Sequence, residues 1–147
     1  MRILLASLAL IASGMAHAGN CSIDLKGDDA MKFDLSTVTV SASCKAITVN
    51  LSHPGKLPAA TMGHNVVISL ASDMQGIAND GLKAGLAGNY VKAGDSRVIA
   101  HTTVVGGGGK TSTSFPGSKL KVGGDYEFFC SAPGHWAVMK GKVVVVK

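Results

Sequence analysis

The residues with the clearest chemical potential lie in one stretch near the C-terminus, from Cys130 to Met139. Four residues separate Cys130 from His135, and three separate His135 from Met139. Thiolate, imidazole and thioether groups are soft or borderline ligands, and together they suit copper better than magnesium or calcium. A cysteine and two histidines with a weak axial methionine form the ligand set of an electron-transfer copper site. The stretch therefore predicts most of a copper site and requires a second histidine from elsewhere.

Each of these residues also has a plain structural interpretation. A lone cysteine at a strand end is most often a small buried hydrophobe, and a methionine at a strand start is usually part of the core. A histidine after Pro133 and Gly134 is usually a surface loop residue. Their joint spacing favours the metal site, as do the odd number of cysteines and the secretory signal pattern at the N-terminus.

Three other histidines are candidates for the missing imidazole. His64 opens a predicted strand, and the alternate residues on its face of that strand are apolar, so its ring should point toward the core. His101 has the opposite parity to its apolar neighbours and is predicted to be exposed. His53, in a loop, is predicted to be partly buried and to titrate. His64 is therefore the preferred second histidine, with His53 and His101 as competitors.

The first 18 residues have the pattern of a secretory signal peptide. Arg2 is followed by a short apolar run, and Ala16-His17-Ala18 matches a small-residue cleavage site. The run is too short to span a bilayer. A core strand or buried helix at the N-terminus is the alternative. The preferred interpretation predicts a single mature domain, 19–147, that is exported and does not insert into a membrane.

Charge and cysteine content narrow the function classes. The formal net charge is +5, but the lysines are scattered and no basic block is combined with stacking aromatic residues, which excludes nucleic acid as a partner. The modest positive charge is expected to bias which redox partner the protein meets. Three cysteines in an oxidising compartment imply one pair and one thiol with another use. Cys21 and Cys44 lie on neighbouring predicted strands and are predicted to pair, which leaves Cys130 for the metal.

The elements that must position these residues are short strands. Ile47, Val49 and Leu51 alternate with polar residues, as expected for a half-buried strand. Strands are predicted at 22–25, 37–40, 47–52, 64–70, 97–105, 110–115, 126–130 and 139–147, with the same alternation at 31–34. Residues 53–63 are predicted to be an irregular loop, and residues 71–88 a short helical flap. The sum predicts an all-β, eight-stranded antiparallel sandwich or Greek-key barrel.

Strand parity places the two ends of the ligand stretch. Tyr126, Phe128 and Cys130 share one face of their strand, and the aromatic pair suggests that this face points inward. Met139 shares a face with Val143, opposite the lysines of the same strand. If these two strands run antiparallel, Cys130 and Met139 lie at the same end of the sandwich.

With this set of residues the chain resembles the azurins, which are blue copper proteins of the cupredoxin family. The Cys-x4-His-x3-Met spacing is that of the azurin ligand loop, and the likeness covers nearly the whole chain after residue 18, including Cys21 and Cys44. The other segments that carry it are Asn50-Leu51-Ser52-His53-Pro54-Gly55, Met62-Gly63-His64-Asn65, Asp73-Met74-Gln75-Gly76, Asp95-Ser96-Arg97-Val98-Ile99-Ala100-His101-Thr102 and Phe128-Phe129-Cys130.

The resemblance implies a specific site for one copper ion. His64, Cys130 and His135 would be the equatorial ligands, Met139 the long axial ligand, and the Gly63 carbonyl would lie opposite Met139. Asn65 would hold the ligand loop near the thiolate, and the edge of His135 would be the electron port. An apolar patch around that edge, here called the port patch, would comprise Met31, Leu57, Met62, Leu82, Pro133, Gly134 and Ala137.

The chain departs from the family's pattern beside the site. Many azurins carry a tryptophan at the position of Val66, and a phenylalanine is frequent at the position of Ala132. The single tryptophan here is Trp136, next to His135. Two placements of Trp136 are open: at the rim of the port patch, replacing lost aromatic area, or packed inward beside the loop.

The expected function is that of a periplasmic electron carrier, not an enzyme. It would pass single electrons between redox proteins such as c-type cytochromes or a periplasmic reductase. The alternative is a periplasmic protein that delivers or buffers copper, but such a protein should carry exposed Met- or His-rich clusters. A structural zinc module is a third possibility, and the close Cys and His pairs of such modules are missing.

Overall fold

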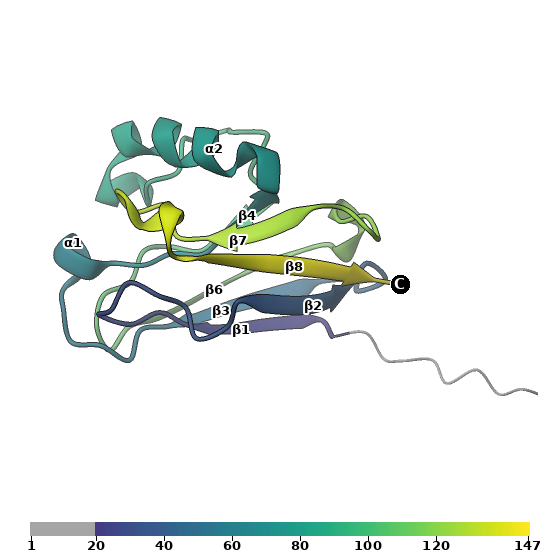
Figure 1. Cartoon of the computed structure of the whole chain (residues 1–147), viewed down its shortest axis with the longest axis horizontal. Coiled ribbons are helices and arrows are strands. Elements are labelled where there is room, and N and C mark those ends of the chain that lie inside the picture. Colours follow the sequence, from purple (N-terminus) through teal and green to yellow (C-terminus); the bar gives the residue numbers. More distant parts are fainter. Residues whose placement is uncertain (1–19) are drawn as a thin grey trace, which may run out of the picture.

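The computed structural model describes residues 20–147. These residues form two β-sheets packed face to face, with a helical flap over the outer side of one sheet (Figure 1). The predicted signal peptide, 1–18, lies outside the described residues. Within 20–147, none of the helices has both the length and the apolar character that a membrane span requires.

Eight strands build the two sheets of the described chain. The smaller sheet has the order β1 (Ser22–Lys26), β3 (Ile47–Ser52) and β6 (Lys110–Phe115). The larger sheet has the order β2 (Thr37–Ser41), β8 (Lys140–Val146), β7 (Tyr126–Phe129), β4 (Val67–Leu70) and β5 (Ala100–His101). The predicted eight-stranded all-β sandwich is therefore confirmed, and its sheets stay open rather than closing as a barrel.

The predicted antiparallel pairing is wrong for two strand pairs. β1 pairs with β3 in parallel, and β2 pairs with β8 in parallel. The chain passes from β1 in one sheet to β2 in the other and then returns to the first sheet as β3. A strand that returns after crossing to the opposite sheet runs in the original direction, which makes β1 and β3 parallel neighbours.

The core lies between the sheets and follows the predicted alternation. Every second residue of β3 is buried, beginning with Ile47, and β8 alternates in the same way through Val143 and Val145. Phe128 of β7 is fully buried among them, with its ring in an edge contact with Phe33. Burial of these apolar side chains is the main favourable term that holds the two sheets together.

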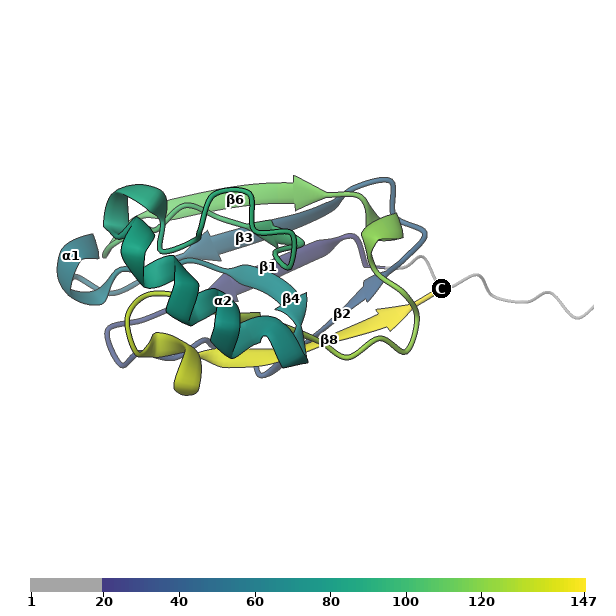
Figure 2. The same cartoon turned by 90° about the horizontal axis from the view of Figure 1, so that it is seen from above.

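The flap changes how β4 is buried. The predicted flap at 71–88 is confirmed as η1 (Ala71–Asp73), α2 (Met74–Gly81), η2 (Leu82–Ala84) and η3 (Leu86–Gly88). α2 buries Met74, Ile77 and Ala78 in a second cluster with Val67 and Phe129. Both faces of β4 are therefore covered, so its burial does not alternate as predicted. Figure 2 shows α2 lying across β4 when the molecule is seen from above.

Several element boundaries differ from the predictions. The predicted strand 64–70 begins at Val67, and His64 forms an isolated bridge with Val105. Leu70, predicted to face the core, is 42% exposed at the strand end. The predicted strand 97–105 is reduced to β5, and 31–34 turns at Met31, which has a φ of 57°. Inside the predicted irregular loop, one helical turn, α1 (Ala59–Met62), follows Pro58 as its N-cap residue.

Candidate metal centre

Three donor side chains converge at one end of the sandwich. His64 precedes β4, Cys130 follows β7, and His135 begins the turn η5 (His135–Ala137). Their donor atoms all lie within 4.8 Å of one another, and all three residues are buried. The Cys130 sulfur is 3.8 Å from His64 Nδ1 and 3.5 Å from His135 Nδ1. The structure therefore brings together a thiol and two imidazoles that are far apart in the sequence.

Met139 adds a fourth donor from the same end. The strands β7 and β8 are antiparallel, with Phe129 opposite Lys140, so Cys130 and Met139 face each other just beyond the paired residues. The Cys130 backbone N–H donates to the Met139 carbonyl at 3.0 Å. A Cβ atom added to Gly27 would lie 2.7 Å from Met139 Cε and 2.9 Å from His64 Cδ2. The thioether end of Met139 and the His64 ring therefore share one neighbour, and Met139 is fully buried as predicted.

The spacing of the donors fits a single small metal ion. Bonds of about 2.0 Å to nitrogen and about 2.3 Å to sulfur, as in zinc sites, place the two donor atoms about 3.5 to 3.7 Å apart at bond angles of roughly 109° to 120°. The two observed sulfur-to-nitrogen distances, 3.5 and 3.8 Å, bracket this range. With one thiolate, two imidazoles and a thioether, the donor chemistry favours copper.

The His64 ring is held in a tautomer that suits coordination. Its Nε2–H donates to the Asp28 carbonyl at 2.8 Å, which leaves the Nδ1 lone pair directed toward Cys130. A backbone partner of this kind fixes both the ring orientation and the tautomer of a ligating histidine. The Asp28 carbonyl also accepts the Met31 N–H at 3.1 Å, so the tight turn at Met31 supports the His64 ring.

The other two candidate histidines do not join the cluster. The His53 ring stacks on His64, with centroids 4.7 Å apart and an interplanar angle of 11°. Its two nitrogens are already used, since Nε2 donates to the Met62 carbonyl and Nδ1 accepts the Gly55 N–H. His53 is 1% exposed, more buried than predicted. His101 lies in β5 at the edge of the larger sheet and is partly exposed, less than predicted.

Burial keeps the three donor groups of the cluster uncharged as long as no ion is bound. Burial raises the pKa of the Cys130 thiol to about 11, because a thiolate is poorly solvated there. Burial, and secondarily the nearby His64, lowers the pKa of His135 to about 4. Burial also lowers the pKa of His64, with the Asp28 carbonyl bond opposing the shift. Both imidazoles are thus neutral near pH 7, and a metal cation would supply the charge that a thiolate needs.

A buried hydrogen-bond network connects the two ligand segments to the flap. The Asn65 Oδ1 accepts the Ser131 N–H at 2.9 Å, and the Asn65 Nδ2 donates to Ser131 Oγ and to the Asn89 carbonyl, each at 2.8 Å. Asn89 has a φ of 57° and accepts the Val104 N–H through its side chain. Asn65 follows His64 and Ser131 follows Cys130, so the network restrains both ligand segments against each other.

Tight turns set the geometry of the loop between Cys130 and Met139. Gly134 has a φ of 79°, a conformation that glycine adopts without strain. The His135 N–H donates to the Ala132 carbonyl at 3.0 Å, and the Met139 N–H donates to the His135 carbonyl at 2.7 Å. These two hydrogen bonds fold the loop back toward the sandwich, so His135 and Met139 face the same interior space as Cys130.

The outer edge of His135 reaches the surface. Among the described residues, the one buried side-chain N or O atom without a hydrogen-bond partner is Glu127 Oε2. Among the described residues His135 Nε2 has no hydrogen-bond partner, so this atom keeps some exposure although His135 as a whole is only 5% exposed. In the predicted port patch, Leu57 is 38% and Leu82 is 48% exposed. Among the other members, Pro133, Gly134 and Ala137 are exposed, whereas Met31 and Met62 are half-buried.

The placement of Trp136, left open by the sequence, is inward. Trp136 is partly buried and packs against the cluster that contains Val67, Ile77 and Phe129. Ala132, within the ligand loop, is buried and 4% exposed. The half-buried indole therefore joins the ligand loop to the flap helix α2.

Sequence reasoning missed several residues that shape the site. Gly27 lies against both His64 and Met139, and Asp28 and Asn89 act through backbone carbonyls. Backbone carbonyls leave no residue-type signal, so only tertiary structure reveals them. The one available sign was Gly27 itself, in a turn where a glycine permits close approach.

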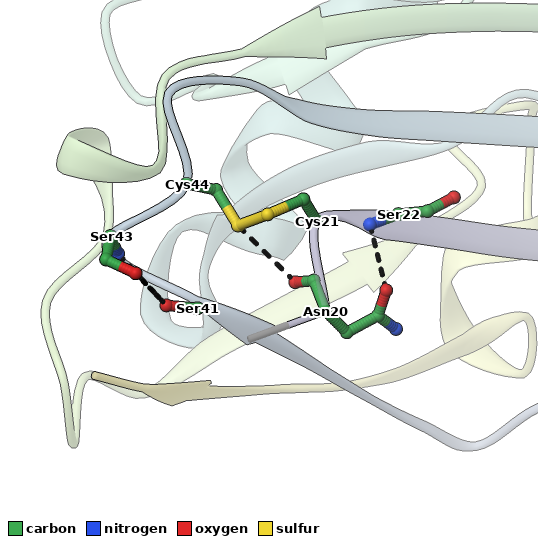
Figure 3. Close-up of a disulfide and its surroundings, with 6 residues drawn as sticks. All are labelled: Asn20, Cys21, Ser22, Ser41, Ser43 and Cys44. Carbon is green, nitrogen blue, oxygen red and sulfur yellow. Dashed lines mark hydrogen bonds between the residues drawn. A yellow bond between two sulfur atoms is a disulfide. The ribbon is translucent and has the colours of Figure 1, made fainter. Parts of the chain in front are cut away.

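The predicted disulfide lies at the opposite end of the sandwich and is confirmed. Cys21 and Cys44 are joined with their Cα atoms 5.7 Å apart (Figure 3). Cys21 precedes β1 and Cys44 precedes β3, whereas the site lies beyond the other ends of these parallel strands. Cys130 is the free cysteine of the described chain and is buried.

Comparisons with known proteins agree with this site. The sequence pattern of the copper binding proteins of the plastocyanin/azurin family matches residues 19–146. An azurin from Alcaligenes faecalis is 56% identical over 123 residues, covering 84% of this chain and 96% of that protein. An azurin from Pseudomonas aeruginosa is 52% identical over 139 residues, covering 95% and 94%, and one from Bordetella pertussis is 51% identical over 144 residues, covering 97% and 96%.

Proposed function

The chain belongs to the plastocyanin/azurin family of copper-binding proteins, and we propose that His64, Cys130, His135 and Met139 hold its single copper ion. When bound, copper in such a site exchanges one electron between Cu(I) and Cu(II). The protein is therefore an electron carrier rather than an enzyme. The observation that carries this conclusion is the convergence of three buried donor atoms within 4.8 Å.

The protein part of the mechanism is to keep the donors in place. An electron carrier works best when its ligands move little on reduction, and here the restraints are buried hydrogen bonds. The Asp28 carbonyl orients His64, and Asn65 restrains the segment after Cys130 through Ser131. The carbonyl of Gly63, which is buried directly before His64, would be an additional weak donor to the ion. Hydrogen bonds around the sulfur tune its donor strength.

His135 is the proposed electron port. Its Nδ1 faces Cys130, and its Nε2 edge keeps some exposure in the loop that also carries the exposed patch residues Pro133, Gly134 and Ala137. A small apolar surface around one exposed ligand edge suits brief docking of a redox protein, because weak electron-transfer encounters bury little area. The proposed partners are c-type cytochromes or a periplasmic reductase.

Export to the periplasm is part of the proposal. The pattern of residues 1–18 supports a signal peptide, which would leave 19–147 as the mature cupredoxin domain. The Cys21–Cys44 disulfide supports an oxidising compartment. Burial of all three donors argues against the alternative, copper delivery, because a delivery site needs ligands that a recipient protein can reach.

The visible spectrum of the oxidised, copper-loaded protein tests the proposal. We expect an intense blue thiolate-to-copper band that disappears reversibly on uptake of one electron. Cys130→Ser should abolish the band, whereas the matched Cys21→Ala/Cys44→Ala variant should retain it. A missing band in the parent protein, or a band that survives Cys130→Ser, would overturn the assignment.

A further inference from the structure

Three exposed lysines border the port patch. Lys32 follows Met31, Lys56 precedes Leu57, and Lys83 follows Leu82, so each lysine is adjacent to a different patch residue. All three are exposed, and they come from three separate segments of the chain. We call Lys32, Lys56 and Lys83 the rim lysines.

Hydrogen bonds hold the first two rim lysines at the site end. The Asp28 N–H donates to the Lys32 carbonyl at 3.3 Å, and the neighbouring Asp28 carbonyl accepts from His64. The Lys56 N–H donates to Asp29 Oδ2 at 2.8 Å. Lys32 and Lys56 are therefore connected through the Asp28–Asp29 turn, which directly supports a proposed ligand.

The third rim lysine approaches from the flap. Lys83 lies in η2, after which the chain turns toward Asn89, whose carbonyl accepts from Asn65 beside the site. Figures 1 and 2 both show the end of the flap at the same end of the molecule as α1 and the loop that contains η5. The rim lysines thus come from three separate segments that meet at this end of the molecule.

The rim lysines are unpaired, whereas the acidic groups beside them are engaged. Ion pairs within residues 20–147 involve Arg97, Lys142 and His53, and none involves a rim lysine. Asp28 Oδ1 accepts the Ala30 N–H, and the Asp29 carboxylate accepts the Lys56 and Leu57 N–H groups. Both carboxylates are thus bound to the loop backbone and stay ionised, with the Asp29 side chain 34% exposed. The three exposed lysines outnumber these two carboxylates, so a docking partner meets a net positive rim.

We propose that the rim lysines select acidic redox partners, meaning proteins whose redox centre opens at an apolar surface bordered by carboxylates. The inference rests on the proposed function of His135 as the port. Complementary charge mainly raises the association rate and orients the encounter, while the apolar patch forms the contact. The rim would therefore govern how fast an acidic partner arrives.

A charge-matched pair of variants tests this selection. The rim variant carries Lys32→Glu, Lys56→Glu and Lys83→Glu. The control carries Lys45→Glu, Lys121→Glu and Lys147→Glu, three exposed lysines near the disulfide end without ion pairs in the described chain. Both variants change the net charge equally, so any difference between them reports the position of the charge.

The kinetic measurement uses oxidation of the reduced protein by small ions and by proteins. Hexacyanoferrate(III) takes up one electron to become hexacyanoferrate(II), and the protein is oxidised by that same electron. At low salt the rim variant should react roughly tenfold more slowly than the control. Tris(phenanthroline)cobalt(III), a cation, should show the opposite order. Proteins should show the same dependence on charge. An acidic c-type cytochrome should oxidise the rim variant more slowly than the control, as hexacyanoferrate(III) does, and a basic c-type cytochrome should oxidise it faster, as the cobalt complex does.

At about 1 M salt these rate differences should vanish, since the screening length falls to about 3 Å.

A binding measurement separates this inference from the proposed function. Redox-inert hexacyanocobaltate(III) should shift the amide NMR signals around the rim lysines of the reduced protein, and the rim variant should lose these shifts. Binding without any one-electron reactivity would overturn the carrier function but leave the charged rim. Normal reactivity with equal rates for the rim and control variants, or shifts centred on the disulfide end, would overturn the rim inference alone.

Discussion

The two ends of the sandwich both depend on cysteine sulfur, but they are built in opposite ways. At one end Cys21 and Cys44 form a covalent cross-link between segments that precede β1 and β3. At the other end Cys130 is buried without a cross-link, and hydrogen bonds of Asn65 and His64 restrain its surroundings. The first end restricts the chain, and the second positions donor atoms.

This difference separates stability from chemistry within one small domain. A disulfide stabilises mainly by restricting the unfolded chain, so its effect does not depend on the geometry of a distant site. The ligand end instead concentrates buried polar side chains, among them His53, His64, Asn65, Ser131 and His135. Such groups stabilise the fold only when their hydrogen bonds are complete. Variants at the two ends should therefore change different observables.

The largest loss of stability is expected from removing the disulfide. Cys21→Ala/Cys44→Ala opens a loop with a sequence separation of 23 residues. The chain-entropy relation gives a loss of about 3 kcal/mol in the free energy of unfolding. Urea unfolding of the copper-loaded protein measures this loss, and the visible band should keep its position. A displaced band would show that the two ends are coupled.

A smaller loss, combined with a change in the site, is expected from Asn65→Ala. The substitution removes three hydrogen bonds and leaves the Ser131 N–H without its buried acceptor, which should cost about 2 kcal/mol. The visible band and the reduction potential should both shift. Asn50→Ala is the matched control, because Asn50 bonds to Asp24 and Ser22 on the partly exposed outer face of β1 and β3. A shift of equal size in the control would remove the special role of Asn65.

The smallest effect on stability is expected from Gly27→Ala. The new methyl group would press on Met139 Cε and the His64 ring, and overpacking of this kind should cost about 1 kcal/mol. Because both neighbours are proposed ligands, the band should shift. In Gly117→Ala, the control at the disulfide end, the new methyl group would instead meet the Cys44 and Ala42 carbonyls. That control should lower the thermal unfolding temperature and leave the spectrum unchanged.

Local patterns in the sequence were enough to predict the framework. The alternation in β3 and β8 depends only on the two-residue repeat of a strand, so it indicated which side chains enter the core. The same repeat turned Cys130 and Met139 inward, and an odd cysteine count isolated Cys130 from the disulfide. Where another layer intervened the rule failed, as in β4, because the flap buries its second face.

The sequence by itself determined the donor types, their spacing and the strands that carry them, because these depend on neighbours close along the chain. Tertiary structure alone decided the parallel pairing of β1 with β3, the inward position of Trp136 and the partners of His64 and Asn65. The bond from His64 to Asp28 spans 36 residues, and that from Asn65 to Ser131 spans 66. Contacts over such separations leave no local periodicity, since they form only when the two sheets and the flap have packed together.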